Sequence, residues 1–350
     1  KTTVHVLTTL DDIVWLLNIR GNDVVCNPVV LSYALVTMER FYLFINEAVL
    51  DSEVKSYLKE LGVTVRPYND IYDAVSQLKG QKVLLETAKT NYAIISNLDE
   101  SNAVVDRMNP TAPAKAVKNP VEIENMKKAH IKDGVAMVKF ICWLKKNIGK
   151  QTITELDAEH YLDNLRAEQE GNLGLSFHTI SAYGANAADP HHMTDTVSVG
   201  KTGDSVVLDI GCKKDGYCSD MTRTVFIGEA SEQAREVYDT VLQANLRAIA
   251  AVKPGARFCD VDKAARDYIT EKGYGPYFTH RTGHCIGQEV HEAGDVSSVN
   301  ENVLKPGMIF SIEPGIYLEG KVGVRIEDLV LVTEEGCEVL NRADKALRII

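Results

Sequence analysis

The sequence lacks a hydrophobic run long enough to cross a membrane, a low-complexity tract and any pair of cysteines at C-x-x-C spacing. A membrane span needs about 20 consecutive apolar residues, so we expect no membrane association. The seven cysteines are an odd, scattered set, which is typical of reduced thiols and fits neither a disulfide framework nor a zinc knuckle. We therefore expect a cytoplasmic protein.

Positive charge is also scarce, because 38 Lys and Arg stand against 49 Asp and Glu and give a formal net charge of -11. The phosphates of a nucleic acid would be repelled, so we expect no nucleic-acid partner. The composition is otherwise that of a globular protein, and 350 residues allow two domains and a substantial core. The first residue is Lys1 rather than Met, so we expect that an upstream segment is missing.

Residues 1–116 alternate short apolar runs with helical patterns. We expect strands at HVLTTL, FYLFI and KVLLET, and helices that end at glycine at EVKSYLKELG and IYDAVSQLKG. Such alternation predicts a small α/β domain. The following segment, RMNPTAPAKAVK, has two prolines and no apolar period, so we interpret it as a linker.

A second domain is expected over residues 117–350. It opens with a long helix, which Asn119 can cap, with Pro120 in the first turn and Glu122 at the acidic position of a capping box. From residue 205 onward strands dominate, and two helices interrupt them at SEQAREVYDTVLQANLRAIAAV and CDVDKAARDYITEKG.

The segment THRTGHCIGQEVHE contains His280, His284 and His291. Helical spacing would put the first two on one face, but each glycine in this segment would cost a helix about 1 kcal/mol. The segment therefore predicts a loop and a short strand. Four other histidines are expected to be structural: His5, His130, His160 and His178.

The segment VVLDIGCKKDGYCSDMTRTVFIG predicts a β-hairpin, because Lys-Lys-Asp-Gly is a turn signal between two apolar runs. With a two-residue loop at Lys214–Asp215, Asp209 lies directly opposite Asp220. With the loop at Asp215–Gly216, the two aspartates are diagonal neighbours on one face, roughly 7–8 Å apart at the backbone. Facing carboxylates repel each other unless a cation lies between them, so either register favours a metal ion.

The segment MIFSIEPGIYLEGKVGVRIEDLVLV predicts a second hairpin of similar design. With a three-residue loop centred on Gly320, Glu313 lies opposite Glu327. Pro314 and Gly315 can distort this ladder, which makes the register less secure than that of the first hairpin.

Together, four carboxylates and one imidazole would hold two divalent cations through mostly oxygen ligands. This set suits Mn²⁺, with Co²⁺ or Zn²⁺ as alternatives, better than it suits a structural zinc ion. Two metal ions can clamp a hydroxide and polarise a carbonyl, which is the equipment for hydrolysis. The competing interpretation is that each aspartate is a turn or surface residue and each histidine satisfies a local hydrogen bond.

The ordered motifs GDSVVLDIG, YCSDMTRT, THRTGHCIGQEVHE, FSIEPGIY and RIED resemble those of the creatinase-like metallopeptidases with the pita-bread fold. This family includes aminopeptidase P, prolidase and methionine aminopeptidase. The resemblance covers roughly residues 119–340. It implies an α+β protein, with a pita-bread catalytic domain over 117–350 and a smaller creatinase-type α/β domain over 1–116.

The resemblance implies a set of five metal ligands. Asp209 would chelate one metal ion, Asp220 and Glu327 would bridge the two ions, and His284 and Glu313 would bind the other. Glu313 would also handle the proton of the attacking hydroxide.

Further residues match positions that contact the substrate in the family. His280 and His291 would hydrogen-bond the scissile peptide and stabilise the tetrahedral intermediate. In the segment GANAADPHHM, His191 is favoured over His192 as a substrate-binding histidine, because it directly follows the proline. Arg325 would orient the site from beside the last ligand.

The segment LTTLDDIVWLLNIRGNDVVCNPVV resembles the amino-terminal-type domain of aminopeptidase P. The resemblance therefore implies an Xaa-Pro aminopeptidase that acts on short proline-containing peptides and forms a homodimer. Prolidase, which takes only Xaa-Pro dipeptides, is the alternative, and a non-catalytic peptide-binding relative is a more remote one. Cys285 stands where the family usually has glycine, and its side chain would either crowd the site or point away.

Overall fold

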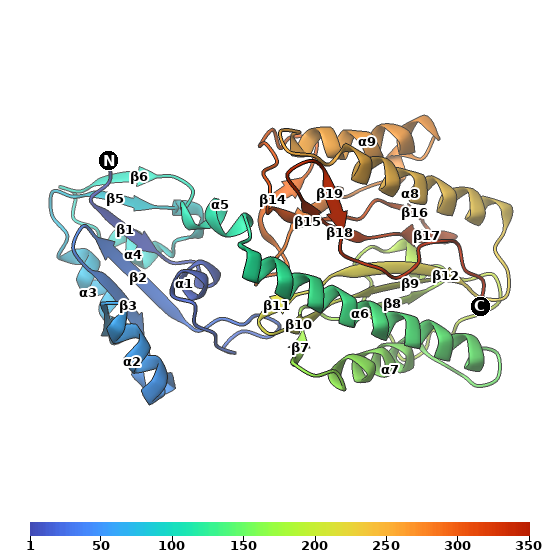
Figure 1. Cartoon of the computed structure of the whole chain (residues 1–350), viewed down its shortest axis with the longest axis horizontal. Coiled ribbons are helices and arrows are strands. Elements are labelled where there is room, and N and C mark those ends of the chain that lie inside the picture. Colours follow the sequence, from blue (N-terminus) through green and yellow to red (C-terminus); the bar gives the residue numbers. More distant parts are fainter. The chain divides into compact units, whose positions relative to one another are not determined.

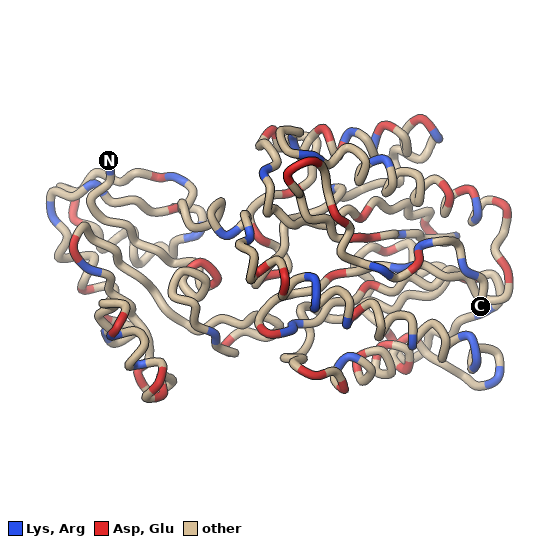
Figure 2. Tube along the Cα trace, in the orientation of Figure 1, with Lys and Arg blue, Asp and Glu red and all other residues tan.

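The computed structural model describes residues 1–350, and the chain divides into two compact units, Lys1–Lys115 and Ala116–Ile350 (Figure 1). The boundary that we expected after residue 116 differs from this division by one residue. Acidic and basic residues alternate along both units instead of gathering on one side (Figure 2). No helix combines the length and the apolar character that crossing a membrane requires.

The first unit is built on a six-stranded mixed sheet with the order β4-β3-β2-β1-β5-β6. Its strands are β1 (Val4–Leu7), β2 (Ser32–Thr37), β3 (Phe41–Ile45), β4 (Val63–Arg66), β5 (Lys82–Leu85) and β6 (Ala103–Asp106). Its helices are α1 (Leu10–Leu17), η1 (Glu47–Val49), α2 (Ser52–Glu60), α3 (Asp70–Ser76), η2 (Thr87–Lys89), α4 (Tyr92–Ser96) and α5 (Thr111–Ala116). The three expected strands and two expected helices are β1, β3, β5, α2 and α3.

Hydrophobic clusters cover both faces of the central strands of this sheet, which fits the continuous apolar run FYLFI of β3. Val4 and Val6 of β1 pack into one hydrophobic cluster together with Ile71 of α3, while Leu7 packs into a second cluster with Ile13 of α1. The segment that we interpreted as an irregular linker contains the short helix α5, because a proline is tolerated in the first turn of a helix.

The second unit carries its helices on two sides of a group of antiparallel sheets (Figure 1). The helices are α6 (Pro120–Asn147), α7 (Glu155–Ala167), η3 (Asn186–Ala188), α8 (Glu232–Ala251), α9 (Phe258–Glu271) and η4 (Gly275–Tyr277). The strands are β7 (Asn172–Leu175), β8 (Ile180–Tyr183), β9 (Ser205–Ile210), β10 (Cys212–Lys214), β11 (Tyr217–Cys218), β12 (Met221–Phe226), β13 (Gly283–Cys285), β14 (Glu292–Val296), β15 (Ile309–Ile312), β16 (Gly315–Leu318), β17 (Val322–Arg325), β18 (Asp328–Val332) and β19 (Cys337–Val339).

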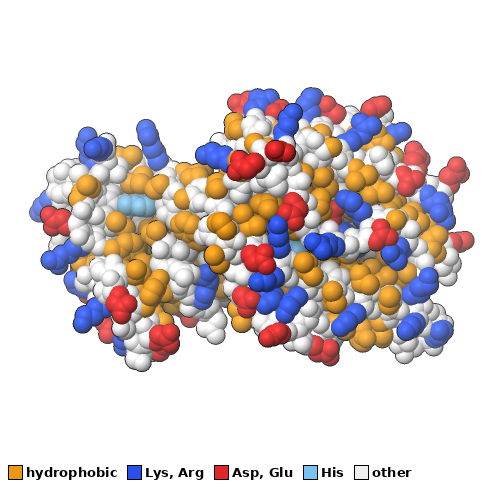
Figure 3. Space-filling model, in the orientation of Figure 1, with side chains coloured by type: hydrophobic (Ala, Val, Ile, Leu, Met, Phe, Trp, Pro, Cys, Tyr) orange, Lys and Arg blue, Asp and Glu red, His pale blue; other side chains and the backbone are white.

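The three long helices expected in this unit are confirmed as α6, α8 and α9. Helix α6 begins as expected, because Asn119 and Glu122 form a complete capping box around Pro120. Helices α6 and α7 pack with β9 and β12 in one hydrophobic cluster, and α8 and α9 pack with β15–β18 in another. The strands therefore lie between two helical layers. On the face that Figure 3 shows, hydrophobic side chains lie between charged ones.

The first expected hairpin is present, and its register is the second of the two alternatives. The loop consists of Asp215 and Gly216, both with positive φ (52° and 84°), as a type I′ turn requires. In this register Thr222 lies opposite Asp209, so Asp220 is the diagonal neighbour of Asp209.

The second hairpin also has the expected register. Its three-residue loop is centred on Gly320, and Gly315 of β16 pairs with Arg325 of β17. Beyond Pro314 the same register continues into a different sheet, where Ile312 of β15 pairs with Asp328 of β18. The proline therefore ends one ladder and the next begins without a shift, so Glu313 and Glu327 occupy opposed positions where the two sheets part.

Candidate metal centre

Three buried side chains of ligand type converge between the sheets. Asp220, His284 and Glu327 each place one ligand atom within 4.8 Å of the others. Glu313 joins them, because its Oε1 lies 3.4 Å from Nε2 of His284, and Oδ2 of Asp220 lies 3.5 Å from the same nitrogen. Asp209 comes from the end of β9, diagonal to Asp220. The fold therefore brings together residues that lie far apart in the sequence.

The carboxylates of this cluster repel one another. Burial, followed by the charges of Asp209 and Glu313, raises the pKa of Asp220 well above its ordinary value. Burial, followed by the charge of Asp220, raises the pKa of Glu327 in the same way. Ionised carboxylates at this depth need a compensating cation.

Two carboxylate oxygens support the same conclusion. Oδ1 of Asp209 and Oε1 of Glu327 are buried and have no hydrogen-bond partner, although their companion oxygens bond Arg325 and Thr222. Buried polar atoms without a partner are rare, and one accepted explanation is that such an atom binds an ion. The donor set of carboxylates and one imidazole fits divalent metal ions.

Glu313 differs from the other carboxylates in its electrostatics. Burial acts to raise its pKa, but the charges of His284, His280 and Arg325 outweigh that effect and hold the pKa below its ordinary value. Ser311 adds to this by donating a 3.0 Å hydrogen bond to its Oε1. Glu313 is therefore ionised at neutral pH and able to accept a proton.

The position of His284 depends on a close approach of two strands. A Cβ at Gly283 would stand 1.8 Å from the carbonyl oxygen of Ser311, so only glycine lets β13 lie this near to β15. The approach lets the N–H of His284 donate to Oγ of Ser311 at 3.0 Å. Ser311 thereby connects His284 to Glu313.

His280 and His291 lie beside this cluster. Nδ1 of His280 is 2.7 Å from the carbonyl oxygen of Arg281, so it carries the proton, and Nε2 accepts from the hydroxyl of Tyr317 at 2.8 Å. Burial lowers the pKa of His280, and the charge of Glu313 acts against this effect. The ring of His291 is exposed, and its centroid lies 4.4 Å from that of His284.

Arg325 is buried and connects several parts of the site. Its Nη2 lies 2.6 Å from Oδ2 of Asp209, and its Nη1 donates to the hydroxyl of Tyr317 at 3.0 Å. Nη1 also donates to the carbonyl oxygen of Pro190 at 3.3 Å, and Nε to Oγ1 of Thr222 at 3.2 Å. Arg325 therefore contacts Asp209 and three further polar groups around the cluster, and its role in orienting the site stays a prediction.

The two consecutive histidines of the upstream segment differ in their surroundings. Nε2 of His192 lies 2.7 Å from Oε2 of Glu155, outside the metal cluster. His191 is exposed, and its charge contributes to lowering the pKa of both His280 and His291. His192 is therefore held by Glu155, and the choice of His191 as the substrate-binding histidine stays a prediction.

Our sequence reasoning missed Tyr317, Thr222 and His130. Tyr317 and Thr222 lie in apolar strand patterns that are typical of core residues, and nothing in those patterns marks them as polar partners of Arg325. His130 was expected to be structural, and its Nε2 accepts the N–H of Asp220 at 3.3 Å. Cys285 belongs to the hydrophobic cluster of α8 and α9, so its sulfur points away from the metal centre.

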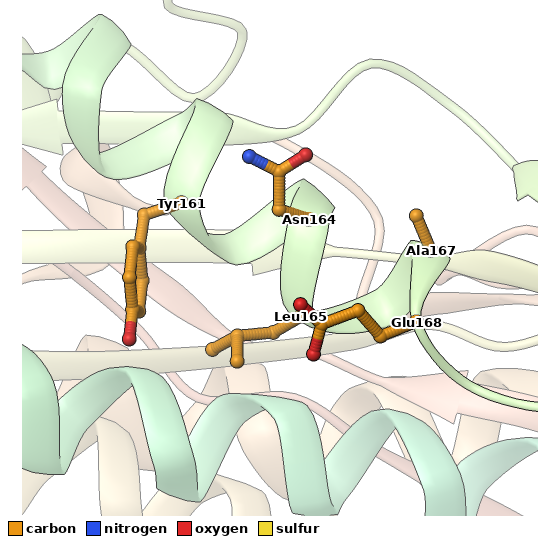
Figure 4. A pocket seen from close by; sticks show the side chains of 5 residues that line it. All are labelled: Tyr161, Asn164, Leu165, Ala167 and Glu168. Atoms are coloured by element: carbon orange, nitrogen blue, oxygen red, sulfur yellow. The ribbon is translucent and has the colours of Figure 1, made fainter.

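A separate pocket of about 560 Å³ lies on α7 (Figure 4). It is lined by Tyr161, Asn164, Leu165, Ala167 and Glu168. This lining contains a single carboxylate and no histidine or cysteine, so the pocket does not offer the groups that the metal centre brings together.

Comparisons with known proteins identify both parts of the chain. Residues 124–334 match metallopeptidase family M24, and residues 1–122 match the creatinase/prolidase N-terminal domain. The chain belongs to metallopeptidase family M24. The family and the α+β architecture expected from the sequence, a pita-bread domain after a creatinase-type α/β domain, are confirmed.

Individual relatives agree with this family. A probable Xaa-Pro aminopeptidase P of Pyricularia oryzae is 37% identical over 94% of this chain and 57% of its own length. Among solved structures, an Xaa-Pro dipeptidase from Bacillus anthracis is 31% identical, with a TM-score of 0.87 over 100% of this chain and 95% of its own. An X-prolyl aminopeptidase from Caenorhabditis elegans, described as a cytosolic enzyme with a di-nuclear active site, is 30% identical, with a TM-score of 0.90 over 98% and 60%. The chain spans little more than half the length of the curated relatives that it matches.

Proposed function

We propose that this chain is a dinuclear-metal exopeptidase that cleaves the Xaa-Pro bond at the amino terminus of short peptides and releases the first residue. The observation that carries the proposal is the cluster of buried, mutually repelling carboxylates around His284. Two oxygens of these carboxylates have no hydrogen-bond partner. The similarity to Xaa-Pro aminopeptidases supplies the substrate class.

Five side chains would hold the two metal ions: Asp209, Asp220, His284, Glu313 and Glu327. Four of them offer carboxylate oxygens, so Mn²⁺ is the favoured ion, with Co²⁺ or Zn²⁺ as alternatives. When bound, such a pair of ions activates water and polarises the scissile carbonyl.

Glu313 would move the proton in this reaction. Its pKa lies below the ordinary value, so it is ionised and can accept a proton from the attacking nucleophile. It would then pass that proton to the leaving nitrogen. A proline nitrogen in a peptide has no hydrogen of its own, so the bond before proline calls for a dedicated enzyme.

The surrounding histidines would bind the peptide and its oxyanion. The exposed His291, close to His284, would donate a hydrogen bond to the developing oxyanion. His191 would contact the substrate from the opposite loop. Both ring nitrogens of His280 are engaged, so His280 would reach the scissile peptide by exchanging its bond to Tyr317 for one to the substrate.

Prolidase activity is the second candidate. The specific observation in its favour is that the likeness to the Bacillus anthracis dipeptidase extends over nearly the whole of both chains. The two activities differ in whether the site accepts a peptide that continues beyond proline.

The test is to strip the chain of metal, load it with Mn²⁺, and quantify alanine released from Ala-Pro and from Ala-Pro-Ala. Release from the tripeptide supports the aminopeptidase, and release from the dipeptide alone supports the prolidase. The Asp209→Asn variant is the control and should release little from either. If the manganese-loaded protein releases no alanine from either peptide, the result would favour a non-catalytic peptide-binding relative.

We also propose a cytoplasmic homodimer. The cytosolic description of the Caenorhabditis elegans relative and the scattered unpaired cysteines support the location. The homodimer rests on the family resemblance, and sedimentation equilibrium with twice the mass of one 38.6 kDa chain would support it.

A further inference from the structure

A buried glutamate outside the metal cluster organises the loop that carries His191. Glu155 is the first residue of α7, and its side chain is 0% exposed. A buried carboxylate is costly unless hydrogen bonds compensate it. Here the compensation comes from the last residue of β8 and from residues 184–198, hereafter the 184–198 loop. This loop is the first part of the connection between β8 and β9.

Each oxygen of Glu155 accepts two hydrogen bonds. Oε1 accepts from the N–H of Tyr183 at 2.8 Å and from Nδ2 of Asn186 at 2.9 Å. Oε2 accepts from Nε2 of His192 at 2.7 Å and from the N–H of Asp195 at 3.3 Å. The four donors span thirteen positions, so one side chain fixes the loop at its start, its middle and its far end.

The loop has further internal bonds around the same anchor. Oδ1 of Asp195 accepts from the N–H of Val197 at 2.8 Å, and Nδ2 of Asn186 also donates to Oγ of Ser198 at 3.0 Å. The backbone of α7 takes part as well, because the N–H of Glu155 donates to the carbonyl oxygen of Ser198 at 3.1 Å. The two ends of the loop are thereby tied to the start of α7.

The middle of the loop lies against the metal centre. The carbonyl oxygen of Pro190 accepts from Arg325 at 3.3 Å, and a Cβ at Gly323 would stand 1.7 Å from the carbonyl oxygen of Ala187. The loop therefore packs closely on β17, the strand that carries Arg325. His191 follows Pro190 directly and is exposed at this place.

Glu155, His192 and Asp195 also place one ligand atom each within 4.8 Å, as a metal site would. Both oxygens of Glu155 already accept hydrogen bonds, however, and Asp195 accepts from two backbone N–H groups of its own turn. The group is satisfied as it stands, in contrast to the partnerless oxygens of Asp209 and Glu327.

We propose that Glu155 and His192 are positioning residues, which act as a clamp that holds the 184–198 loop so that His191 and the carbonyl of Pro190 face the metal centre. The effect on catalysis rests on the proposed function. The N–H of His192 donates to the carbonyl oxygen of Asp189 at 3.2 Å and closes a turn that contains Pro190 and His191. Anchoring the imidazole of His192 on Glu155 therefore also fixes the turn from which His191 projects.

The clamp is tested with two substitutions at one position. His192→Gln retains an amide N–H that can donate to Glu155, whereas His192→Leu has a similar size and no donor. The matched control is His160→Leu, which makes the same change at an exposed histidine of α7, the helix that carries Glu155. His191→Ala provides a second comparison, because it removes the presented side chain and leaves the clamp intact.

We expect His192→Leu to increase hydrogen exchange of the backbone amides of residues 186–195 and to lower kcat/KM about 10-fold, a loss typical of residues that orient others in a metal site. His192→Gln should stay within about 3-fold of the parent protein, a smaller loss than removing an outer-shell partner causes. Manganese content should be the same in all variants. His191→Ala should lose activity without any change in exchange, and His160→Leu should change neither property.

Unchanged exchange of residues 186–195 in His192→Leu would overturn the clamp, and so would increased exchange with full activity. Should the loop of His192→Leu prove too disordered to interpret, Glu155→Gln gives the second measurement. It replaces one acceptor oxygen by an amide, so exchange should rise at Asp195 if the clamp is correct and stay unchanged if it is not. An inactive parent protein would refute the proposed function, while the exchange comparison would still decide the clamp.

Discussion

Nη2 of Arg325 lies 2.6 Å from Oδ2 of Asp209, although 116 positions separate the two residues. The guanidinium engages one oxygen of the carboxylate, while Oδ1 of Asp209 has no hydrogen-bond partner. Arg325 is itself fixed by Tyr317 and Thr222. The contact therefore keeps Oδ2 occupied and leaves Oδ1 as the oxygen that would bind metal in the proposed function.

Replacing Arg325 with lysine should preserve the charge and lose this geometry. An ammonium cannot reach Asp209, Tyr317 and Thr222 together, because it is a point donor rather than a planar fork. We expect Arg325→Lys to lower kcat/KM about 10- to 100-fold and to weaken manganese binding by a similar factor. Kinetics on Ala-Pro peptides and a calorimetric manganese titration check both values. Parent-like manganese affinity would show that the contact does not orient Asp209.

Replacing Glu313 with glutamine should abolish the proton transfer while the fold is retained. The amide cannot accept the proton, and general acid–base catalysis contributes about 10²- to 10⁴-fold to rate. We expect kcat of Glu313→Gln to fall at least about 100-fold, with an unchanged circular dichroism spectrum. The comparison must use manganese at saturation, because the variant also loses a ligand charge. A kcat within a few-fold of the parent would assign the proton transfer to another group.

The two hairpins show what the sequence specified well. In the first, Asp215 and Gly216 both adopt positive φ, and this turn chemistry sets the register that places Asp220 diagonal to Asp209. In the second, the loop at Gly320 sets a register that continues unchanged past Pro314. Local turn rules thus predicted the register of the second hairpin and limited that of the first to two alternatives, of which the structure has the second.

The partners that hold those ligands could not be predicted in this way. Tyr317 lies eight positions from Arg325 in an apolar strand, and His130 lies 90 positions from Asp220 on a helix whose inner face is mostly apolar. Their contacts depend on how helices and sheets pack, and no local pattern encodes that packing. The same holds for Glu155, which at the start of a capped helix has the ordinary appearance of a first-turn acid.

Adding metal should stabilise the second unit markedly. Without a cation, Asp220 and Glu327 are buried among like charges, so metal binding removes a repulsion that opposes folding. At 100 times the dissociation constant, a ligand that binds only the folded state contributes about 2.7 kcal/mol. We expect manganese to raise Tm of the parent protein by several degrees in calorimetry and that of Asp209→Asn by less. Equal shifts in both proteins would place the stabilising ion elsewhere.

Cys285 should prove to be a core residue with no part in catalysis. Its side chain is 0% exposed and packs in the cluster that contains Phe258 and Phe310. We expect Cys285→Ala to cost on the order of 1 kcal/mol in the free energy of unfolding, because it removes one buried atom. Urea unfolding measures this cost, and kcat/KM should stay near the parent value. A large loss of activity at normal stability would mean that the sulfur acts on the site.

His130 should help to hold Asp220 in place by accepting a hydrogen bond from the backbone N–H of Asp220. Nδ1–H of His130 donates to the carbonyl oxygen of Met126 at 2.7 Å, which leaves Nε2 to accept the N–H of Asp220 at 3.3 Å. Burial lowers the pKa of His130 to about 4, so the neutral ring with a free Nε2 lone pair is the form present at pH 7. The ring therefore provides the acceptor that this buried N–H requires.

Two substitutions of His130 separate its two bonds. Asparagine can replace the donor at Nδ1 but cannot reach Asp220, whereas glutamine can place an oxygen near the position of Nε2. We expect His130→Asn to leave the N–H of Asp220 unsatisfied and to cost about 1–3 kcal/mol of stability. Its manganese affinity should fall further than that of His130→Gln, as measured by titration at one pH. If glutamine instead weakens manganese binding as much as asparagine does, the effect of His130 comes from the packing of its ring beneath α6 and not from the hydrogen bond to Asp220.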